Sequence, residues 1–188
     1  MPKKKPSELR IIAGQFRSRK IVFFEEDGLR PTHNRIRETL FNWLAPYIEN
    51  SVCLDAFAGS GALGFEALSR GAKQVTFCDL SRNIIQVLKE NATTLKITNA
   101  DFIQGDFVKQ NILQNKFDVV FLDPPFQKEA LLPACEFIMT HQLLNPHAQL
   151  YLEFKKKSID LSQLPKNWVI KKHKETGTIE YLLCEFLG

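Results

Sequence analysis

The chain lacks any long hydrophobic run, although 44% of its 188 residues are hydrophobic. A membrane-spanning helix needs about 20 consecutive apolar residues, and the shorter apolar core of a secretory signal is also missing behind the initial M-P-K-K-K. Internal repeats are absent as well. We therefore expect a protein of the cytoplasm with no membrane partner, long enough for one compact domain and a small appendage.

Cysteine is scarce, and its spacing is not that of a zinc or redox site. The four cysteines, Cys53, Cys78, Cys135 and Cys184, are scattered through apolar stretches and form no C-x-x-C pair. Zinc ligands and redox cysteines usually lie two or three residues apart. The pattern predicts four reduced core thiols and no metal site.

Positive charge gathers at the start of the chain, since residues 1–37 hold ten Lys or Arg and four acids, while the whole chain has a net charge of +4. Arg35 and Arg37 lie near a predicted helix start, where the helix dipole disfavours cations. Contact with phosphates would explain this placement, and an ordinary solvated surface would explain it equally well. The candidate RNA-binding residues are Arg10, Arg17, Arg19, Lys20, Arg30, Arg35 and Arg37.

The most informative stretch is residues 52–68, where an apolar run ends at Asp55, a glycine turn follows and a helical pattern begins. Gly59 and Gly61 allow a sharp turn and the close approach of a ligand. Gly59 to Gly64 also satisfies G-x-G-x-x-G, so a dinucleotide site and a purely structural turn remain alternatives. Asp55 favours a ligand with a cationic amino-acid end, such as S-adenosylmethionine, because a carboxylate here would repel a pyrophosphate.

Two further acids follow predicted strands. Asp79 ends the run 74–79 and is placed to accept hydrogen bonds from both ribose hydroxyls of a nucleoside-containing cofactor. Asp106 follows a short strand at 101–104 and could accept from an adenine amino group, with Phe107 packed beside the ring. Asp106 could equally be the N-cap of a short helix.

A rigid segment whose carbonyl oxygens can accept hydrogen bonds is predicted after the apolar run 117–122. It consists of Asp123, Pro124, Pro125 and Phe126. Two consecutive prolines cannot donate hydrogen bonds and resist helix formation, so they hold the chain extended with its carbonyls available. Such a segment suits an amine that must donate hydrogen bonds.

Strands and helices alternate along most of the chain, which favours an α/β fold with a doubly wound, Rossmann-like sheet. The sheet is expected to be mainly parallel, with one antiparallel strand near its edge in a C-terminal hairpin. Residues 1–8 are expected to be disordered. The predicted strands are 52–55, 74–79, 101–104, 117–122, 149–154, 168–173 and 179–186. One predicted helix has Thr32 or Asn34 as its N-cap and ends before Pro46, others span 82–95 and 128–141, and a fourth follows Gly61. A basic hairpin is expected between 10 and 24.

With these motifs assembled, the chain resembles the class I S-adenosylmethionine-dependent methyltransferases that modify nucleobase amino groups. Within them it resembles most the RsmD family of bacterial small-subunit (16S) ribosomal RNA guanine-N2 methyltransferases. The similarity covers roughly Arg10 to the C-terminus. It rests on R-I-I-A-G-Q-F-R-S-R-K from Arg10, L-R-P-T from Leu29, R-I-R-E-T-L-F-N-W-L from Arg35 and L-D-A-F-A-G-S-G-A-L-G from Leu54.

The resemblance implies S-adenosylmethionine as cofactor, and small-subunit ribosomal RNA or an assembling small ribosomal subunit as partner of a monomeric enzyme. Residues 1–30 would form a basic arm and hairpin, and residues 31–188 the methyltransferase domain. The methyl group would pass to the N2 amine of a guanine held by the Asp123 carboxylate and the Pro124 carbonyl, with Phe126 stacked on the base. The implied site residues are Asp55, Phe57, Gly59, Ser60, Gly61, Asp79, Leu80, Asp106 and Phe107 for the cofactor, and Asp123, Pro124, Pro125 and Phe126 for catalysis.

Three alternatives stay open from the sequence. An adenine-N6 methyltransferase acting on DNA or RNA would share D-P-P-F, but not the pattern from Arg10 to Trp43. A dinucleotide-binding oxidoreductase would leave Asp55 and the diproline unexplained. A non-catalytic RNA-binding module would have no need of Asp55, Asp79 and Asp123.

Overall fold

The computed structural model describes residues 6–24, 34–106, 108–109, 115–126 and 130–188. It contains nine strands, four α-helices and one short 3-10 helix within those ranges. The strands are β1 (Pro6–Arg10), β2 (Lys20–Phe24), β3 (Val52–Asp55), β4 (Gln74–Asp79), β5 (Ala100–Gln104), β6 (Phe117–Leu122), β7 (Leu144–Lys155), β8 (Trp168–Thr176) and β9 (Ile179–Phe186). The helices are α1 (Asn34–Trp43), α2 (Ala62–Ser69), α3 (Arg82–Leu95), α4 (Leu131–Thr140) and η2 (Leu161–Gln163).

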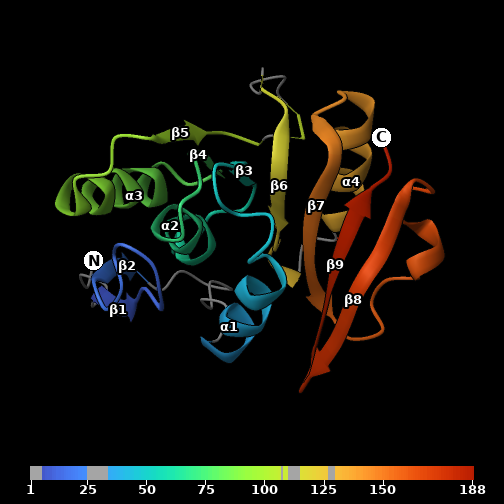
Figure 1. Ribbon diagram of the computed structural model, residues 1–188, viewed down its shortest axis with the longest axis horizontal. Coiled ribbons are helices and arrows are strands. Elements are labelled where there is room, and N and C mark those ends of the chain that lie inside the picture. The colour runs from blue at the N-terminus through green and yellow to red at the C-terminus, as the bar shows by residue number, and fades with distance from the viewer. Residues whose placement is uncertain (1–5, 25–33, 107, 110–114, 127–129) are drawn as a thin grey trace.

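A seven-stranded sheet in the order β5-β4-β3-β6-β7-β9-β8 forms the centre of the molecule (Figure 1). Strands β5, β4, β3, β6 and β7 pair in parallel, whereas β9 runs antiparallel to both β7 and β8. The prediction of a doubly wound, mainly parallel sheet with one antiparallel strand near its edge is confirmed. No helix in the part of the chain described here is long and apolar enough to cross a membrane.

Apolar side chains cover both faces of this sheet. One cluster contains Leu40 and Phe41 of α1 together with residues of α2, α3 and the sheet. The other packs α4, through side chains such as Ile138, against the opposite face. The four cysteines are buried and unbonded to one another, as expected for core thiols, and burial raises the pKa of the Cys53 and Cys78 thiols to about 12. They are therefore unreactive packing residues.

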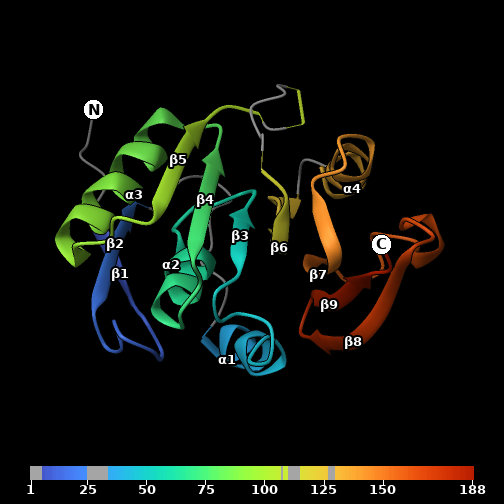
Figure 2. The same cartoon turned by 45° about the horizontal axis from the view of Figure 1, so that its top comes forward.

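Strands β1 and β2 form an antiparallel hairpin that lies against α3, as both views show (Figures 1 and 2). Ile11 and Ile21 are buried in the same cluster as α1, α2 and α3. The Val22 N–H donates to Asn91 Oδ1 at 2.9 Å, and Asn91 Nδ2 donates to the Val22 carbonyl at 2.7 Å. The predicted hairpin is confirmed, and it shares a core with the helices.

Some predicted boundaries were wrong. Pro6, Ser7 and Glu8 belong to β1 rather than to a disordered tail, because they pair with Phe24, Phe23 and Val22. Strand β7 begins five residues before the predicted Gln149, and a register shift interrupts its pairing with β6 between Phe117 and Val119. Helix α4 is described from Leu131, and residues 127–129 lie outside the described ranges, as does the predicted boundary between residues 1–30 and 31–188, which stays a prediction.

Candidate active site

The predicted site residues lie along one edge of the sheet, at the carboxyl ends of three neighbouring strands. Asp79 is the last residue of β4, Asp55 is the last residue of β3, and Asp123 directly follows β6. Because β4, β3 and β6 are adjacent and parallel, their carboxyl ends meet at this edge. Ligands of open α/β sheets bind in the crevice outside the carboxyl ends of the strands.

Asp79 joins the two loops that follow β3 and β4. Its Oδ2 accepts from the Gly59 N–H at 3.0 Å, and its Oδ1 accepts from the Ser81 N–H at 2.8 Å. The side chain is half-buried, and the neighbouring Leu80 side chain is 51% exposed. A carboxylate has about four lone-pair positions, so a carboxylate held in this way can accept further hydrogen bonds from hydroxyl groups.

Asp55 holds the start of α2. Its side chain is 2% exposed, and its Oδ2 accepts from the Gly64 N–H at 2.9 Å. Burial raises the pKa of this carboxyl well above its usual range, the Gly64 N–H opposes the rise, and the negative charges of Asp123 and Asp79 add to it. The acids at this edge repel one another when they are charged. A cationic ligand bound beside them would be attracted and would relieve that repulsion.

The glycine turn between β3 and α2 requires its glycines for two different reasons. Gly59 and Gly61 have φ of 49° and 75°, in the left-handed region that glycine adopts without strain. A Cβ on Gly64 would lie 2.2 Å from Phe77 Cε1, so only glycine fits where α2 crosses β4. Ser60 is buried and Phe57 is half-buried within the same turn.

Asp106 lies in the loop after β5, on the far side of β4 from Asp55. Its Oδ1 accepts from the Val108 N–H at 3.3 Å, and its Oδ2 lies 3.2 Å from the Lys109 ammonium. It therefore caps the turn that follows it. The short helix for which the sequence offered Asp106 as N-cap lies partly outside the described residues, and the contact of Asp106 with an adenine stays a prediction. Phe107 lies outside the described residues.

The diproline segment after β6 presents a mixed surface. Asp123 and Pro125 are half-buried, Pro124 is buried, and the Phe126 side chain is 43% exposed. An exposed phenylalanine beside a half-buried carboxylate is well suited to stack on a planar base whose amine donates to that carboxylate.

The candidate RNA-binding residues divide into an exposed group and one buried exception. Arg10, Arg17, Arg19, Lys20 and Arg35 are exposed, while Arg30 lies outside the described residues. Arg37 is only 1% exposed, and the prediction that it binds RNA was wrong. Its Nη2 donates to the Arg10 carbonyl at 3.0 Å and to Asn34 Oδ1 at 2.6 Å, and its Nη1 lies 3.9 Å from Glu66 Oε2.

Sequence reasoning missed two buried groups beside the site. Tyr151 and Glu153 lie on β7, next to β6, and the Tyr151 hydroxyl donates to Glu153 Oε2 at 2.5 Å. Glu153 stands inside the apolar run from Leu150 to Phe154, and an acid in such a run is the signal that could have revealed a buried carboxyl.

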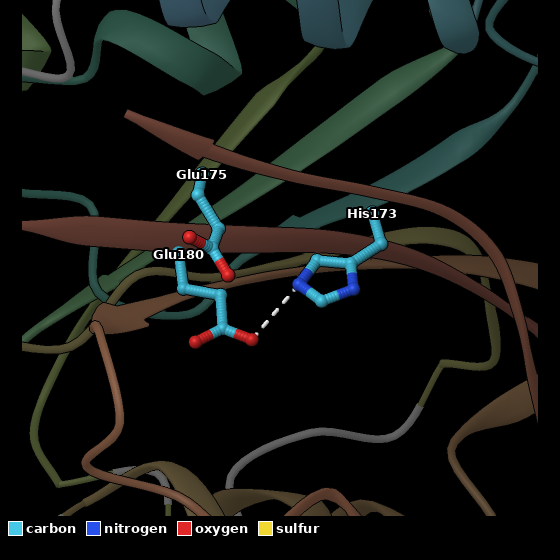
Figure 3. Close-up of side chains that lie close together, drawn as sticks. All are labelled: His173, Glu175 and Glu180. Atoms are coloured by element: carbon cyan, nitrogen blue, oxygen red, sulfur yellow. Dashed lines mark hydrogen bonds and ion pairs between the residues drawn. The ribbon is translucent and has the colours of Figure 1, made fainter. Parts of the chain in front are cut away.

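A second polar cluster lies on the β8–β9 hairpin and contains His173, Glu175 and Glu180 (Figure 3). Their possible ligand atoms lie within 4.8 Å of one another, a spacing that a metal ion could bridge. Each is also engaged within the protein: His173 Nε2 lies 2.8 Å from Glu180 Oε1, and Glu175 pairs with the Lys156 ammonium. The cluster ties the two strands together at the edge of the sheet.

Comparison with known proteins gives a consistent set of relatives. The family model described as Conserved hypothetical protein 95 matches residues 9–185. Two proteins named Ribosomal RNA small subunit methyltransferase D are similar: one from Haemophilus influenzae, 48% identical over 95% of this chain and 94% of its own length, and one from Escherichia coli K12, 40% identical over 95% and 90%.

Among solved structures, a candidate methyltransferase from Escherichia coli has a TM-score of 0.86 at 38% identity, covering 97% of this chain and 99% of its own. A candidate methylase from Haemophilus influenzae has a TM-score of 0.82 at 44% identity, covering 97% and 100%.

Proposed function

Because the chain belongs to the family described as Conserved hypothetical protein 95, we propose that it methylates the exocyclic N2 amine of a guanine in small-subunit ribosomal RNA, using S-adenosylmethionine. This membership, together with the relatives named Ribosomal RNA small subunit methyltransferase D, confirms the resemblance to the RsmD family. The enzyme acts as a monomer in the cytoplasm, on the RNA itself or within an assembling small subunit.

One observation supports this function most directly. Three carboxylates at neighbouring strand ends, Asp79, Asp55 and Asp123, lie on the same sheet edge as two exposed apolar side chains, Leu80 and Phe126. Exposed apolar groups beside convergent polar groups are typical of sites that bind planar ligands. Each end of this edge therefore offers one exposed apolar side chain to an aromatic partner.

The residues near Asp79 suit S-adenosylmethionine, which supplies an electrophilic methyl group on a positively charged sulfur. Asp79 accepts the ribose hydroxyls, and Leu80 covers one side of the nucleoside. A cationic methionine end bound here would favour the charged form of Asp55, whose pKa burial raises, and would be attracted by the neighbouring acids. Glycines 59 and 61 let the main chain approach the ligand.

The residues after β6 act on the substrate amine. The lone pair of an aryl amine is delocalised into its ring, so the nitrogen becomes a better nucleophile when its hydrogens are held out of the ring plane. The Asp123 carboxylate and the Pro124 carbonyl accept those hydrogens, and Phe126 stacks on the base, which must be flipped out or unpaired to reach the pocket. Orientation contributes more than a strong base, because the amine loses its proton readily once it is methylated.

Nucleoside mass spectrometry tests this function. Small-subunit ribosomal RNA and assembled small subunits from cells lacking the enzyme are each incubated with the protein and S-adenosylmethionine, then digested. N2-methylguanosine should form with the parent protein, and about 10²–10³-fold more slowly with Asp123→Ala. Formation of N6-methyladenosine, or no methylation of either substrate, would overturn the proposal.

Replacing Asp79 should weaken cofactor binding. Asp79→Ala removes a charged acceptor. We expect S-adenosylmethionine to bind about 1.5–3 kcal/mol more weakly, which is the usual contribution of a hydrogen bond to a charged group. Isothermal titration calorimetry measures it. Asp101→Ala is the matched control, since this exposed acid lies near the amino end of β5. Equal affinities of parent and Asp79→Ala would remove Asp79 from the site.

Replacing exposed arginines of the hairpin turn should weaken RNA binding and leave cofactor binding intact. For the double variant Arg17→Gln, Arg19→Gln, we expect the slope of log affinity against log salt concentration to become shallower. Its magnitude should decrease by about 1 for each lost phosphate contact. Lys116→Gln, an exposed change just before β6 and so at the opposite sheet edge from Asp123, should leave the slope unchanged. If both variants have the parent slope, the hairpin turn makes no phosphate contact.

A further inference from the structure

Glu153 is a buried acid that has no part in the methyl transfer proposed above. It is 3% exposed, on β7, in the middle of the sheet. A charged carboxylate at such a place is costly unless it is paired with a cation or becomes neutral. Among the described residues, the Tyr151 hydroxyl donates a hydrogen bond to the Glu153 side chain, and a hydroxyl is not a cation. Glu153 therefore needs an explanation.

Strand register brings Glu153 to the level of Asp123. Strands β6 and β7 are parallel, and their last paired residues are Leu122 and Leu152. Asp123 and Glu153 each follow by one residue, so they lie next to each other at the carboxyl edge and on the same face of the sheet as Phe121 and Tyr151, by the alternation of side chains along a strand. The acceptor of the proposed reaction thus has a second acid as its neighbour.

We propose that Glu153 is a positioning residue for the methyl transfer: in its protonated form it accepts a hydrogen bond from Tyr151 and donates one to the Asp123 carboxylate, which keeps that carboxylate oriented toward the substrate amine. This role rests on the proposed function. It requires no covalent step, since the Glu153 proton stays on its oxygen.

The electrostatics agree with a protonated acid. Burial raises the pKa of Glu153 to about 8, the negative charge of Asp123 adds to the rise, and the Tyr151 hydrogen bond opposes it. A carboxyl group with this pKa is mostly uncharged at neutral pH and is then a hydrogen-bond donor.

Three groups face Glu153 from the strands around it, and α1 and β8 each add one more group to the cluster. Asp123 faces it from the end of β6, Tyr151 from β7 itself and Tyr181 from β9, where it is the register partner of Glu153. Trp43 of α1 stacks on Tyr181 at 5.5 Å. The ammonium of Lys174 on β8 lies 5.9 Å from the Trp43 ring.

Methyl transfer measured against pH tests the role. As the pH rises through the pKa of Glu153, its proton is lost, the donor disappears and a second negative charge is left beside Asp123. We therefore expect kcat of the parent to fall on the alkaline side. Glu153→Gln keeps a donor and an acceptor but cannot ionise, so it should retain kcat within a few fold at pH 7 and lose the alkaline fall.

Glu153→Ala provides the contrast. We expect kcat to drop by about 10- to 100-fold, the range for a hydrogen bond to a charged group, with KM for S-adenosylmethionine unchanged. Tyr151→Phe should give a smaller drop in kcat, because it leaves the Glu153 donor in place. The proposal is overturned if Glu153→Gln is as slow as Glu153→Ala, or if it shows the same alkaline fall as the parent.

A carbon-13 NMR titration of the glutamate carboxyls separates this proposal from the proposed function, because it needs no substrate. The Glu153 carbon should titrate near pH 8, and Asp123→Asn should lower that pKa by removing the neighbouring negative charge. An ordinary pKa near 4.5, or one that Asp123→Asn leaves unmoved, would refute the pairing with Asp123 even if the parent enzyme methylates RNA. A parent that methylates no RNA would refute only the proposed function.

Discussion

Replacing Asp123 by asparagine should leave methyl transfer measurable, whereas alanine should slow it by about 10²–10³-fold, the usual loss when one preorganised transition-state partner is removed. Asparagine keeps a carbonyl oxygen that accepts a hydrogen bond from the amine, but it cannot take a proton. Alanine removes the acceptor and the base together. The difference in rate between the two variants therefore separates a role as hydrogen-bond acceptor from a role as general base.

Single-turnover methyl transfer on saturating RNA and cofactor is the measurement. Calorimetry with S-adenosylmethionine serves as the control, and both variants should bind it with nearly the parent affinity, because Asp79 and the glycine turn are untouched. An Asn variant as slow as the Ala variant, with binding intact, would show that Asp123 works as a general base.

Replacing Glu66 by alanine should lower the free energy of unfolding by about 3–5 kcal/mol, as when one partner of a buried ion pair is removed. Glu66 is fully buried on α2, and its carboxylate binds the hairpin to the body of the protein. It accepts from the Ile12 N–H at 2.7 Å, the Ala13 N–H at 3.1 Å and Arg70 Nε at 2.7 Å. Without it, these donors lose their acceptor, and the buried Arg37 guanidinium loses the negative charge that lies 3.9 Å away.

Urea unfolding of the two proteins gives this difference directly, provided the transition remains two-state. Glu90→Ala on the exposed face of α3 is the matched control and should change stability by less than about 0.5 kcal/mol. Glu66→Gln should fall between the two, because it keeps an acceptor and loses the charge. A loss below about 1 kcal/mol for Glu66→Ala would mean that the apolar contacts of Ile11 and Ile21 suffice to hold the hairpin.

Local pattern was enough to predict the elements that carry the site. The bounds of β4, α3, β6 and β9 agree with the sequence expectation, because each is a run of apolar periodicity, and β4 and β6 run into an acid. The sequence also predicted that Asp55 and Asp79 end strands and that Asp123 follows one. Parallel strands joined by helices share a carboxyl edge, and the strand order then brings the three acids together there.

The burial of single charges could not be predicted in the same way. Arg35 and Arg37 are two residues apart on α1, and 3.6 residues per turn set them about 200° apart around the helix axis. Arg35 is exposed and Arg37 is buried, because the hairpin and Glu66 lie against one side of that helix only. Helical spacing sets Arg37 on the same face as the buried Leu40 and Phe41, but the helix sequence does not show which distant groups pair with its charge.

The sequence by itself determined the strands, the glycine turn, the diproline edge and hence the chemistry of the carboxyl edge, since these depend on residues close together in the chain. Tertiary structure alone decided that Arg37 pairs with Glu66 inside the protein and that Glu153 lies beside Asp123, 30 positions earlier in the numbering. The physical reason is that the protonation and the partners of a buried charge depend on desolvation and on neighbours brought in from distant segments, and neither is encoded in local pattern.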